Sequence, residues 1–316
     1  MTMPTCSVVI PVFNSQETLS ELVNRLEGVF SSRAIPFEAI FVDDGSQDRS
    51  WECICQLATG RPWMRGICLM RNYGQHNALL CGIRSAVHEV IVTMDDDLQH
   101  PPEEIPRLLD KLAEGYDVVY GRPLQEQHGI WRDLASRFTK LALQSAMGDR
   151  TASEVSAFRA FRSTVRNAFA NYQSSHVSID VLLTWGTTRF SSIPVQHFPR
   201  PAGTSQYTFR KLISHALNMI TGYSILPLQL ASLMGFSFAL FGLLVLVYVV
   251  GRYLIQGGSV PGFPFLASTI AIFSGVQLFA LGIIGEYLAR MHFRLMERPS
   301  YVVSDETATA GAELPV

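Results

Sequence analysis

The feature that most limits what this chain can fold into is a long stretch almost without charge. Residues 225–289 carry only two charged side chains, Arg252 and Glu286. Within this stretch, residues 228–250 and 265–285 carry none. Each run exceeds the roughly 20 apolar residues that a helix needs to cross a bilayer. Two such runs in succession predict a transmembrane hairpin rather than a buried core helix.

Basic residues on both sides of this hairpin predict its orientation. Excess Lys and Arg mark the cytoplasmic flanks of membrane spans. They are Arg210 and Lys211 before the first span and Arg290, Arg294 and Arg298 after the second. The sequence also lacks the basic start and long apolar core of a secretory signal. We therefore expect a multi-pass protein of the inner (cytoplasmic) membrane, with the remaining chain in the cytoplasm.

Outside residues 225–289 the composition is that of a soluble domain. The other 251 residues hold 50 of the 52 charged side chains, or about 20%, which is near the usual quarter. The net charge of −2 argues against nucleic acid as a partner, because binding it requires a basic surface. The five cysteines lack the spacing of a zinc or redox pair, so we expect them to be small buried groups.

Apolar runs alternate with helical patterns through the first 120 residues. We expect strands at Ser7–Phe13, Phe37–Val42, Gly66–Met70, Val90–Met94 and Asp117–Tyr120. Helical patterns cover residues 16–30, 50–58 and 75–86, and a further helix opens at Pro101-Pro102. This alternation predicts an α/β fold with a doubly wound, mostly parallel sheet. Ligands of such sheets bind beyond the carboxyl ends of the strands.

The segment before the first span has an amphipathic helical pattern. Apolar residues recur at helical spacing between 207 and 224, and polar residues occupy the other face. This pattern predicts an interfacial helix on the bilayer, with a core-facing helix as the alternative. The expected organisation is a soluble domain (1–206), this helix, the transmembrane domain (225–289) and a cytoplasmic C-terminal tail (290–316).

Three consecutive carboxylates, Asp95, Asp96 and Asp97, follow the fourth expected strand. They repel one another unless a cation lies among them, and Mg²⁺ binds carboxylate and phosphate oxygens. If the strand continues to Asp95, the side chains of Asp95 and Asp97 share one face and Asp96 faces away. The alternative is a solvated acidic turn.

A second acidic pair, Asp43-Asp44, follows the second expected strand. Carboxylates at this position can accept hydrogen bonds from a base or a ribose, although a capped turn is the alternative. No glycine-rich phosphate loop occurs in the sequence. Phosphates would therefore be held by a metal and by arginines. The candidate arginines are Arg71, Arg122, Arg159, Arg200 and Arg210.

The order of these motifs resembles the polyprenyl-phosphate glycosyltransferases of glycosyltransferase family 2. The group includes dolichyl-phosphate mannose synthases and bacterial undecaprenyl-phosphate glucosyl and aminoarabinose transferases. The resemblance runs from Ser7 to about Val303. Its elements are SVVIPVFN, VDDGSQD, RNYGQHNA, DDDLQHPPEEIPRL, GRP, FRAFR, RPAGTSQYTF and GEYLARMHFRLMERPSYVV. It implies a GT-A-type fold and inverting transfer of a sugar from a nucleotide sugar to a polyprenyl phosphate, for a cell-envelope glycan or lipid.

The resemblance also implies roles for individual residues. It places a metal at Asp95, Asp97 and Gln99. It places the nucleotide at Pro11, Val12, Asp43, Asp44, Arg71, Gln75, Asp95 and Asp96. It places the lipid phosphate at Arg200, Ser205, Tyr207, Arg210 and Lys211. It gives catalytic roles to Asp97, Arg122, Arg200 and an acidic residue before Phe158.

Three positions depart from the pattern of these relatives. Ser15 stands where many relatives have Glu, and Gln206 stands where the basic loop often has Lys. Ala157 precedes Phe158 where an Asp is usual nearby. Glu154 is the nearest carboxylate and our choice for that acidic residue, with Asp149 farther upstream.

The expected partners follow from the implied reaction. We expect Mg²⁺ or Mn²⁺ as cofactor, a UDP-sugar rather than a GDP-sugar as donor, polyprenyl phosphate as acceptor, and the lipid bilayer. A homo-oligomer is left open, and the sequence does not identify the sugar. Two alternatives are a processive polysaccharide synthase, whose QxxRW element is absent, and a non-catalytic membrane scaffold that binds nucleotide sugars.

Overall fold

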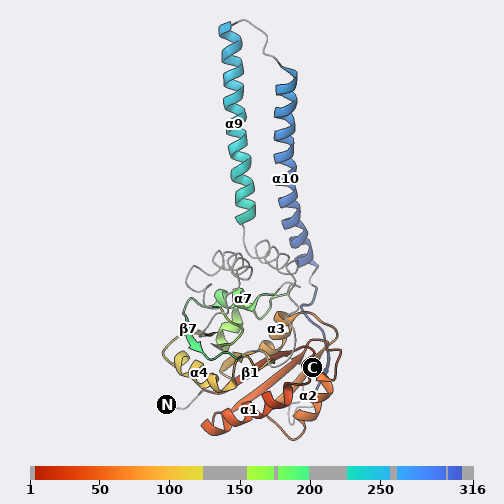
Figure 1. Cartoon of the computed structure of the whole chain (residues 1–316), viewed down its shortest axis with the longest axis vertical. Helices are drawn as coiled ribbons and strands as arrows, with labels where there is room; N and C mark the ends of the chain where they lie inside the picture. Colours follow the sequence, from red (N-terminus) through yellow and green to blue (C-terminus); the bar gives the residue numbers. More distant parts are fainter. Residues whose placement is uncertain are drawn as a thin grey trace. The chain divides into compact units, whose positions relative to one another are not determined.

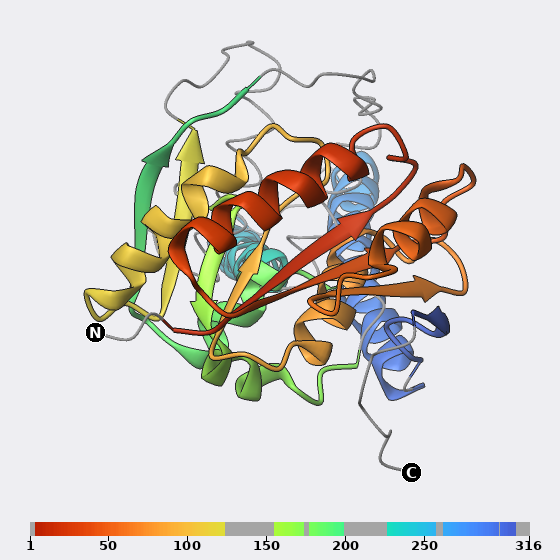
Figure 2. The ribbon, with the colours of Figure 1, turned by 90° about the horizontal axis from the view of Figure 1, so that it is seen from below.

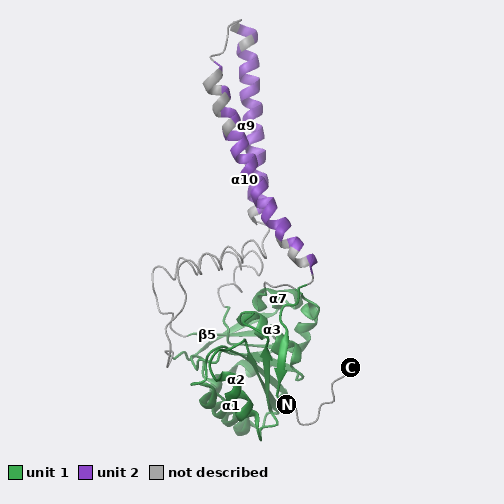
Figure 3. Cartoon of the chain, turned by 90° about the vertical axis from the view of Figure 1, so that its right-hand side faces the viewer, with its two compact units in different colours: residues 1–209, 297–316 green, residues 210–296 purple. Residues whose placement is uncertain are grey.

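The chain forms two compact units, which Figure 3 shows in different colours. The first contains residues 1–209 and 297–316, and the second contains residues 210–296. The computed structural model describes residues 4–123, 155–173, 177–198, 226–256, 262–296 and 298–307.

The first unit is built on one eight-stranded sheet with the strand order β7-β5-β6-β4-β1-β2-β3-β8. The strands are β1 Cys6–Val12, β2 Phe37–Asp43, β3 Met64–Leu69, β4 Val90–Thr93, β5 Val118–Pro123, β6 Arg159–Arg162, β7 Phe190–Val195 and β8 Val303–Glu306. Strands β1 to β4 pair in parallel, as does β7 with β5. Strands β6 and β8 pair antiparallel to their neighbours. The predicted α/β sheet is confirmed, and it is a mixed one.

Helices cover both faces of the sheet (Figures 1 and 2). One face packs against α1 Leu19–Arg33, α2 Ser50–Ala58 and α4 Ile105–Ala113. The other face packs against α3 Gln75–Ser85 and α7 Ile179–Gly186. Two 3₁₀ helices, η1 Pro102–Glu104 and η2 Ser163–Phe169, complete the described elements of this unit.

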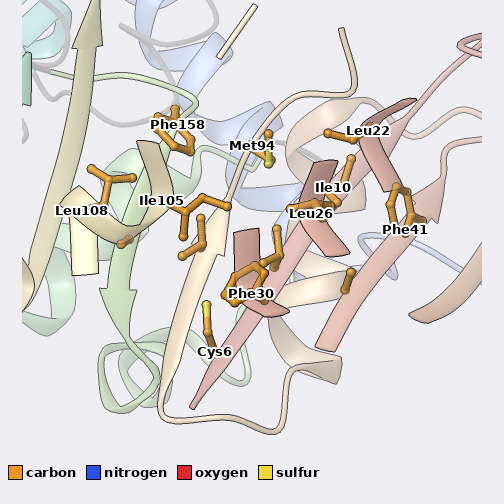
Figure 4. Close-up of a cluster of buried hydrophobic side chains, with 14 of the residues drawn as sticks. Cys6, Ile10, Leu22, Leu26, Phe30, Phe41, Met94, Ile105, Leu108 and Phe158 are labelled. Atoms are coloured by element: carbon orange, nitrogen blue, oxygen red, sulfur yellow. The ribbon is translucent and has the colours of Figure 1, made fainter. Parts of the chain in front are cut away.

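Strand β1 lies inside the sheet, between β4 and β2, and helices cover both of its faces. All seven of its residues are buried, as a parallel strand between two helical layers requires. The stripe of α1 that faces it is apolar at helical spacing: Leu19, Leu22, Val23, Leu26, Val29 and Phe30 are buried. Figure 4 shows Leu22, Leu26 and Phe30 packed beside Ile10 of β1.

The C-terminal segment differs from the sequence prediction. We expected a tail over residues 290–316, but Val303–Glu306 forms strand β8 at the edge of the sheet, antiparallel to β3. The pairing continues beyond the strand, because the amide of Met70 donates to the carbonyl of Val302 over 2.9 Å. The physical reason is the open edge of β3, whose unpaired backbone groups accept another strand.

The second unit contains two long helices, α9 Leu226–Gln256 and α10 Phe263–Leu295, which run side by side (Figures 1 and 3). The rings of Phe238 and Phe273 meet edge to face at 6.1 Å. Both helices are long and apolar enough to cross a membrane, over Leu228–Arg252 and Ile272–Ala289. The two predicted spans therefore lie in two helices, and the expected interfacial helix (207–224) lies outside the described residues.

Candidate active site

Three polar segments meet beyond the carboxyl ends of β1, β2 and β4, as the sequence predicts. The amide of Asn14 donates to Oγ of Ser46 over 3.0 Å, and Oδ1 of Asn14 accepts from the amide of Gln47 over 2.7 Å. The amide of Phe13 donates to Oδ2 of Asp96 over 3.4 Å. These bonds join the segments after β1, β2 and β4 into one rim. Pro11 and Val12, which the resemblance places at the nucleotide, are buried in β1 just below this rim.

Asp43 ends β2 and has one oxygen without a hydrogen bond. Its Oδ2 accepts from the amide of Ser46 over 3.2 Å and lies 3.6 Å from Sγ of Cys68. Its Oδ1 is buried and has no hydrogen-bond partner among the residues that the structure describes. Burial raises the pKa of Asp43, because the carboxylate has lost water. A buried acceptor left unpaired is costly, so this atom marks a place where a donor group can bind.

Asp44, the next residue, has both oxygens engaged by the backbone. Oδ1 accepts from the amide of Tyr73 over 2.7 Å, and Oδ2 accepts from the amide of Gly74 over 2.8 Å. The side chain is buried, and burial raises the pKa of Asp44 to about 6. Asp44 therefore contacts the loop between β3 and α3 through both oxygens.

The acidic segment after β4 is a turn and not a continuation of the strand. Leu98 has a φ of 58°, and Oδ1 of Asp97 accepts from the amide of Gln99 over 3.1 Å. Oδ1 of Asp95 accepts from Nε2 of Gln75 at the start of α3 over 2.6 Å. The Asp96 side chain bonds instead to the end of β1, and burial raises the pKa of Asp96 to about 6.

The side chains of Asp95, Asp97 and Gln99 are a suitable donor set for a hard divalent cation. They offer carboxylate and amide oxygens and are only partly exposed. Among the described residues, no group of three or more His, Cys, Asp or Glu side chains could hold a metal by itself. This fits Mg²⁺ or Mn²⁺ in a transferase, because Mg²⁺ is commonly held by one or two carboxylates together with substrate phosphates.

A small aromatic cluster lies directly behind the acidic turn and was missed by the sequence reasoning. The ring of His100 stacks on Phe158 at 5.4 Å and meets His197 at 4.9 Å. The amide of Phe198 donates to the carbonyl of Gln99 over 2.9 Å. Burial lowers the pKa of His100 to about 4. The cluster joins the acidic turn to β6 and to the segment after β7.

Three of the five arginines that the sequence offered as phosphate ligands lie in the described residues. Arg71 and Arg122 are exposed, and the Arg71 guanidinium lies 4.6 Å from the centre of the Tyr73 ring. Arg159 was a wrong candidate. It is 2% exposed and forms an ion pair with Asp180, because β6 is an inner strand whose polar side chains must find partners inside the domain.

The remaining predicted site residues lie outside the described residues. They are Glu154, Arg200, Ser205, Tyr207, Arg210 and Lys211.

Comparison with known proteins identifies the family. The model of glycosyl transferase family 2 matches residues 7–172. An undecaprenyl-phosphate 4-deoxy-4-formamido-L-arabinose transferase of Pectobacterium carotovorum is 35% identical over 96% of this chain and 94% of the relative. A transferase of the same name from Edwardsiella ictaluri is 36% identical over 95% of this chain and 93% of its own length.

Solved structures share the fold at low sequence identity. Glucosyl-3-phosphoglycerate synthase of Mycobacterium tuberculosis, crystallised with Mn²⁺, UDP and phosphoglyceric acid, matches with a TM-score of 0.52 and 16% identity, over 69% of this chain and 76% of that one. Mannosyl-3-phosphoglycerate synthase of Rubrobacter xylanophilus matches with a TM-score of 0.51 and 14% identity, over 83% and 79%.

Proposed function

Because this chain belongs to glycosyl transferase family 2 and is a glycosyltransferase, we propose that it transfers a sugar from UDP to a polyprenyl phosphate at the cytoplasmic face of a cell membrane. The observation that carries the proposal is the rim beyond β1, β2 and β4. Asp43, which has an unpaired carboxylate oxygen, ends β2, and the acidic turn follows β4; only β1 lies between these two strands. The relatives named as undecaprenyl-phosphate sugar transferases, which align along nearly the whole chain, support the choice of acceptor.

The hydrogen-bond state of Asp43 supports uracil over guanine as the base. Uracil presents one N–H between two carbonyls, whereas guanine presents two adjacent donor groups that match both oxygens of a carboxylate. Only Oδ1 of Asp43 lacks a partner among the described residues, since Oδ2 accepts from Ser46. A single unpaired oxygen matches a single N–H donor.

The same rim has the groups that the diphosphate leaving group needs. We assign the cation to Asp95, Asp97 and Gln99, and the nearby phosphate contacts to Arg71 and Arg122. A bound divalent ion supplies Lewis-acid stabilisation of the charge that develops on the departing nucleotide. The exposed guanidinium groups add hydrogen bonds and charge.

The acceptor requires positioning more than activation. The second pKa of a phosphate ester lies near 6, so the lipid phosphate is mostly dianionic at neutral pH. We assign its binding to Arg200, Ser205, Tyr207, Arg210 and Lys211, and we assign an acid–base role to Glu154. In-line attack of the phosphate oxygen on the anomeric carbon, with departure of UDP, inverts that centre.

The two apolar helices anchor the enzyme where its acceptor lies. We place α9 and α10 across the membrane, with both flanks in the cytoplasm as the Lys and Arg distribution indicates. A polyprenyl phosphate keeps its chain in the bilayer and its phosphate at the surface. A membrane anchor therefore keeps the enzyme at the surface where its acceptor lies.

The test is release of UDP from UDP-sugars by the purified full-length chain in detergent. We expect release that requires undecaprenyl phosphate and a divalent cation together. UDP-4-deoxy-4-formamido-L-arabinose is the first donor to try, because the relatives carry that sugar in their names. Release with GDP-sugars but not with UDP-sugars would contradict the choice of base.

A further inference from the structure

The middle carboxylate of the acidic turn, Asp96, contacts a different part of the rim from its two neighbours. The proposed cation site uses Asp95 and Asp97 and gives Asp96 no role. Oδ2 of Asp96 accepts from the amide of Phe13 over 3.4 Å. The hydroxyl of Ser15 hydrogen-bonds the same carboxylate and also lies 3.2 Å from the carbonyl of Phe13. Asp96 therefore brings a negative charge to the segment that follows β1.

The pairing of β1 with β4 is the reason why these two segments meet. The strands are parallel neighbours, with Val9 opposite Thr93, so their carboxyl ends reach the rim side by side. The amide of Met94 donates to the carbonyl of Val9 over 3.3 Å, which continues the contact up to the acidic turn. Positions 15 and 96 are therefore neighbours, and a side chain from either segment can reach the same part of the rim.

Position 15 is also a position where this chain departs from its relatives, many of which have Glu there. Ser15 carries no charge, but the carboxylate of Asp96 lies within hydrogen-bond reach of its hydroxyl. A Glu at position 15 would bring a second carboxylate next to Asp96, and two carboxylates that share a site repel each other. The rim thus accommodates one carboxylate beside the amide of Phe13, and in this chain it comes from the segment after β4.

We propose that Asp96 replaces the glutamate that is missing at position 15, so that one carboxylate beside the amide of Phe13 serves the nucleotide whichever segment supplies it. The inference rests on the nucleotide-sugar function proposed above. Carboxylates beyond the strand ends of such sheets accept hydrogen bonds from ribose hydroxyls, so the ribose of the donor is the group that this carboxylate binds. The proposal links two features that the resemblance leaves separate, the uncharged Ser15 and the third carboxylate of the acidic turn.

The backbone around position 15 is fixed by bonds that do not involve the Ser15 side chain. The amide of Ser15 donates to Oγ of Ser50 over 2.9 Å, and the amide of Gln16 donates to Oδ2 of Asp48 over 3.2 Å. Both bonds join the segment after β1 to the segment after β2, and both remain when the Ser15 side chain is exchanged. Variants at position 15 therefore test the carboxylate and leave these backbone contacts in place.

The first test is a double-mutant cycle on the affinity for UDP, measured on the full-length chain in detergent with EDTA so that no cation contributes. Asp96→Ala removes the carboxylate, and Ser15→Glu adds a second one beside it. We expect each single change to weaken UDP binding about tenfold, the effect of about one charge-assisted hydrogen bond. The two changes together should restore the affinity to within about threefold of wild type, because contacting residues are not additive. A double variant that binds no better than Asp96→Ala would overturn the proposal.

Ser20→Glu is the matched control, because it makes the same substitution at an exposed position of α1. By itself it should leave the affinity for UDP unchanged, and it should not restore the affinity of Asp96→Ala. If Ser20→Glu restored binding as well as Ser15→Glu does, the recovery would come from net charge and not from a shared position on the rim, and the proposal would be wrong.

The second test needs no nucleotide and separates this proposal from the proposed function. Two carboxylates at one position destabilise the fold, so we expect Ser15→Glu to lower the melting temperature and Asp96→Ala to remove most of that loss in the double variant. Changes in melting temperature that add would show that the two side chains do not share a position, which contradicts the proposal. If the wild-type chain bound no UDP, the proposed donor would be wrong, while the melting temperatures would still decide whether Asp96 occupies the position of the glutamate.

Discussion

Asp44 has a pKa of about 6, raised by burial from the ordinary value of 3.8, and this shift predicts a pH-dependent stability. Between pH 3.8 and pH 6, the Asp44 carboxyl is mostly protonated in the folded protein and mostly ionised in the unfolded chain. The stabilisation from Asp44 is therefore complete below pH 3.8 and is lost as the pH rises through 6. The loss between pH 4 and pH 7 is about 2 kcal/mol.

Asp44→Asn removes this titrating group, so a comparison of the variant with the wild type tests the prediction. We expect the free energy of unfolding of the wild type, minus that of Asp44→Asn, to fall as the pH rises from 4 to 7. Denaturant unfolding in detergent at several pH values gives this difference. A difference that is constant, or that grows with pH, would contradict the assignment.

At the acidic turn, we expect Asp97→Asn to lower sugar transfer by orders of magnitude at saturating Mg²⁺, because a lost transition-state contact with a cation costs several kcal/mol. The melting temperature should change little, since Asp97 is partly exposed and outside the apolar core. Asp110→Asn makes the same change on an exposed position of α4 and should leave transfer intact. Near-normal turnover of Asp97→Asn would remove Asp97 from the cation site.

Sequence could predict which residue types gather on the rim but not how each is used. Strand ends and their polar neighbours follow from hydrophobic pattern, so Asn14, Asp43 and Asp95 were expected at one edge. Asp43 and Asp44 look equivalent in sequence, and only the position of the amides of Tyr73 and Gly74 distinguishes them. Arg159 was wrongly expected at the phosphates, because the sequence does not show that it pairs with Asp180.

Among the elements, α7 is joined to the sheet by a buried ionic cluster. Arg159 of β6 and Tyr120 of β5 both contact Oδ1 of Asp180 on α7. We expect Asp180→Ala to lower the free energy of unfolding by about 3–5 kcal/mol, because it leaves a buried guanidinium without its carboxylate.

The control is Glu103→Ala, which removes the surface partner of Arg25. That change should cost less than about 1 kcal/mol, the usual worth of an exposed pair. Denaturant unfolding of the two variants measures both values. Equal, small losses would show that the Asp180 cluster does not hold α7 on the sheet.

Strand β8 gives a prediction about the end of the chain. Deleting residues 303–316 removes the partner of β3 and exposes its edge. We expect a lower melting temperature and faster proteolysis of the first unit. A chain that ends at Thr307 keeps the strand and is the control. If the two truncated chains were equally stable, the pairing of β8 with β3 would contribute nothing.

The parallel core was predictable because its strands are long, apolar and separated by helical patterns. Strands β6 and β8 have four residues each, and their sequences RAFR and VSDE show little alternation that would mark a strand. Both are defined by pairing with strands distant in sequence. Their antiparallel direction follows from long-range topology that local pattern does not contain.

At the scale of the whole molecule, the charge-poor and the charged parts of the sequence correspond to the two compact units. The charge-poor region forms α9 and α10, and the charged region forms the sheet domain. In the proposed function, one chain combines a site for a water-soluble donor with an anchor in the membrane that holds the acceptor. The proposed reaction gives a product in which the sugar of the donor is joined to the lipid phosphate.

The most direct measurement is the identity of that product. The purified full-length chain is incubated with undecaprenyl phosphate, Mg²⁺ and each of a panel of UDP-sugars, and the lipids are analysed by mass spectrometry and NMR. We expect one donor to give undecaprenyl phosphate carrying a single sugar, with the anomeric configuration opposite to that in the donor. UDP release without a lipid-linked sugar, or a product that keeps the configuration of the donor, would contradict direct transfer to the lipid phosphate.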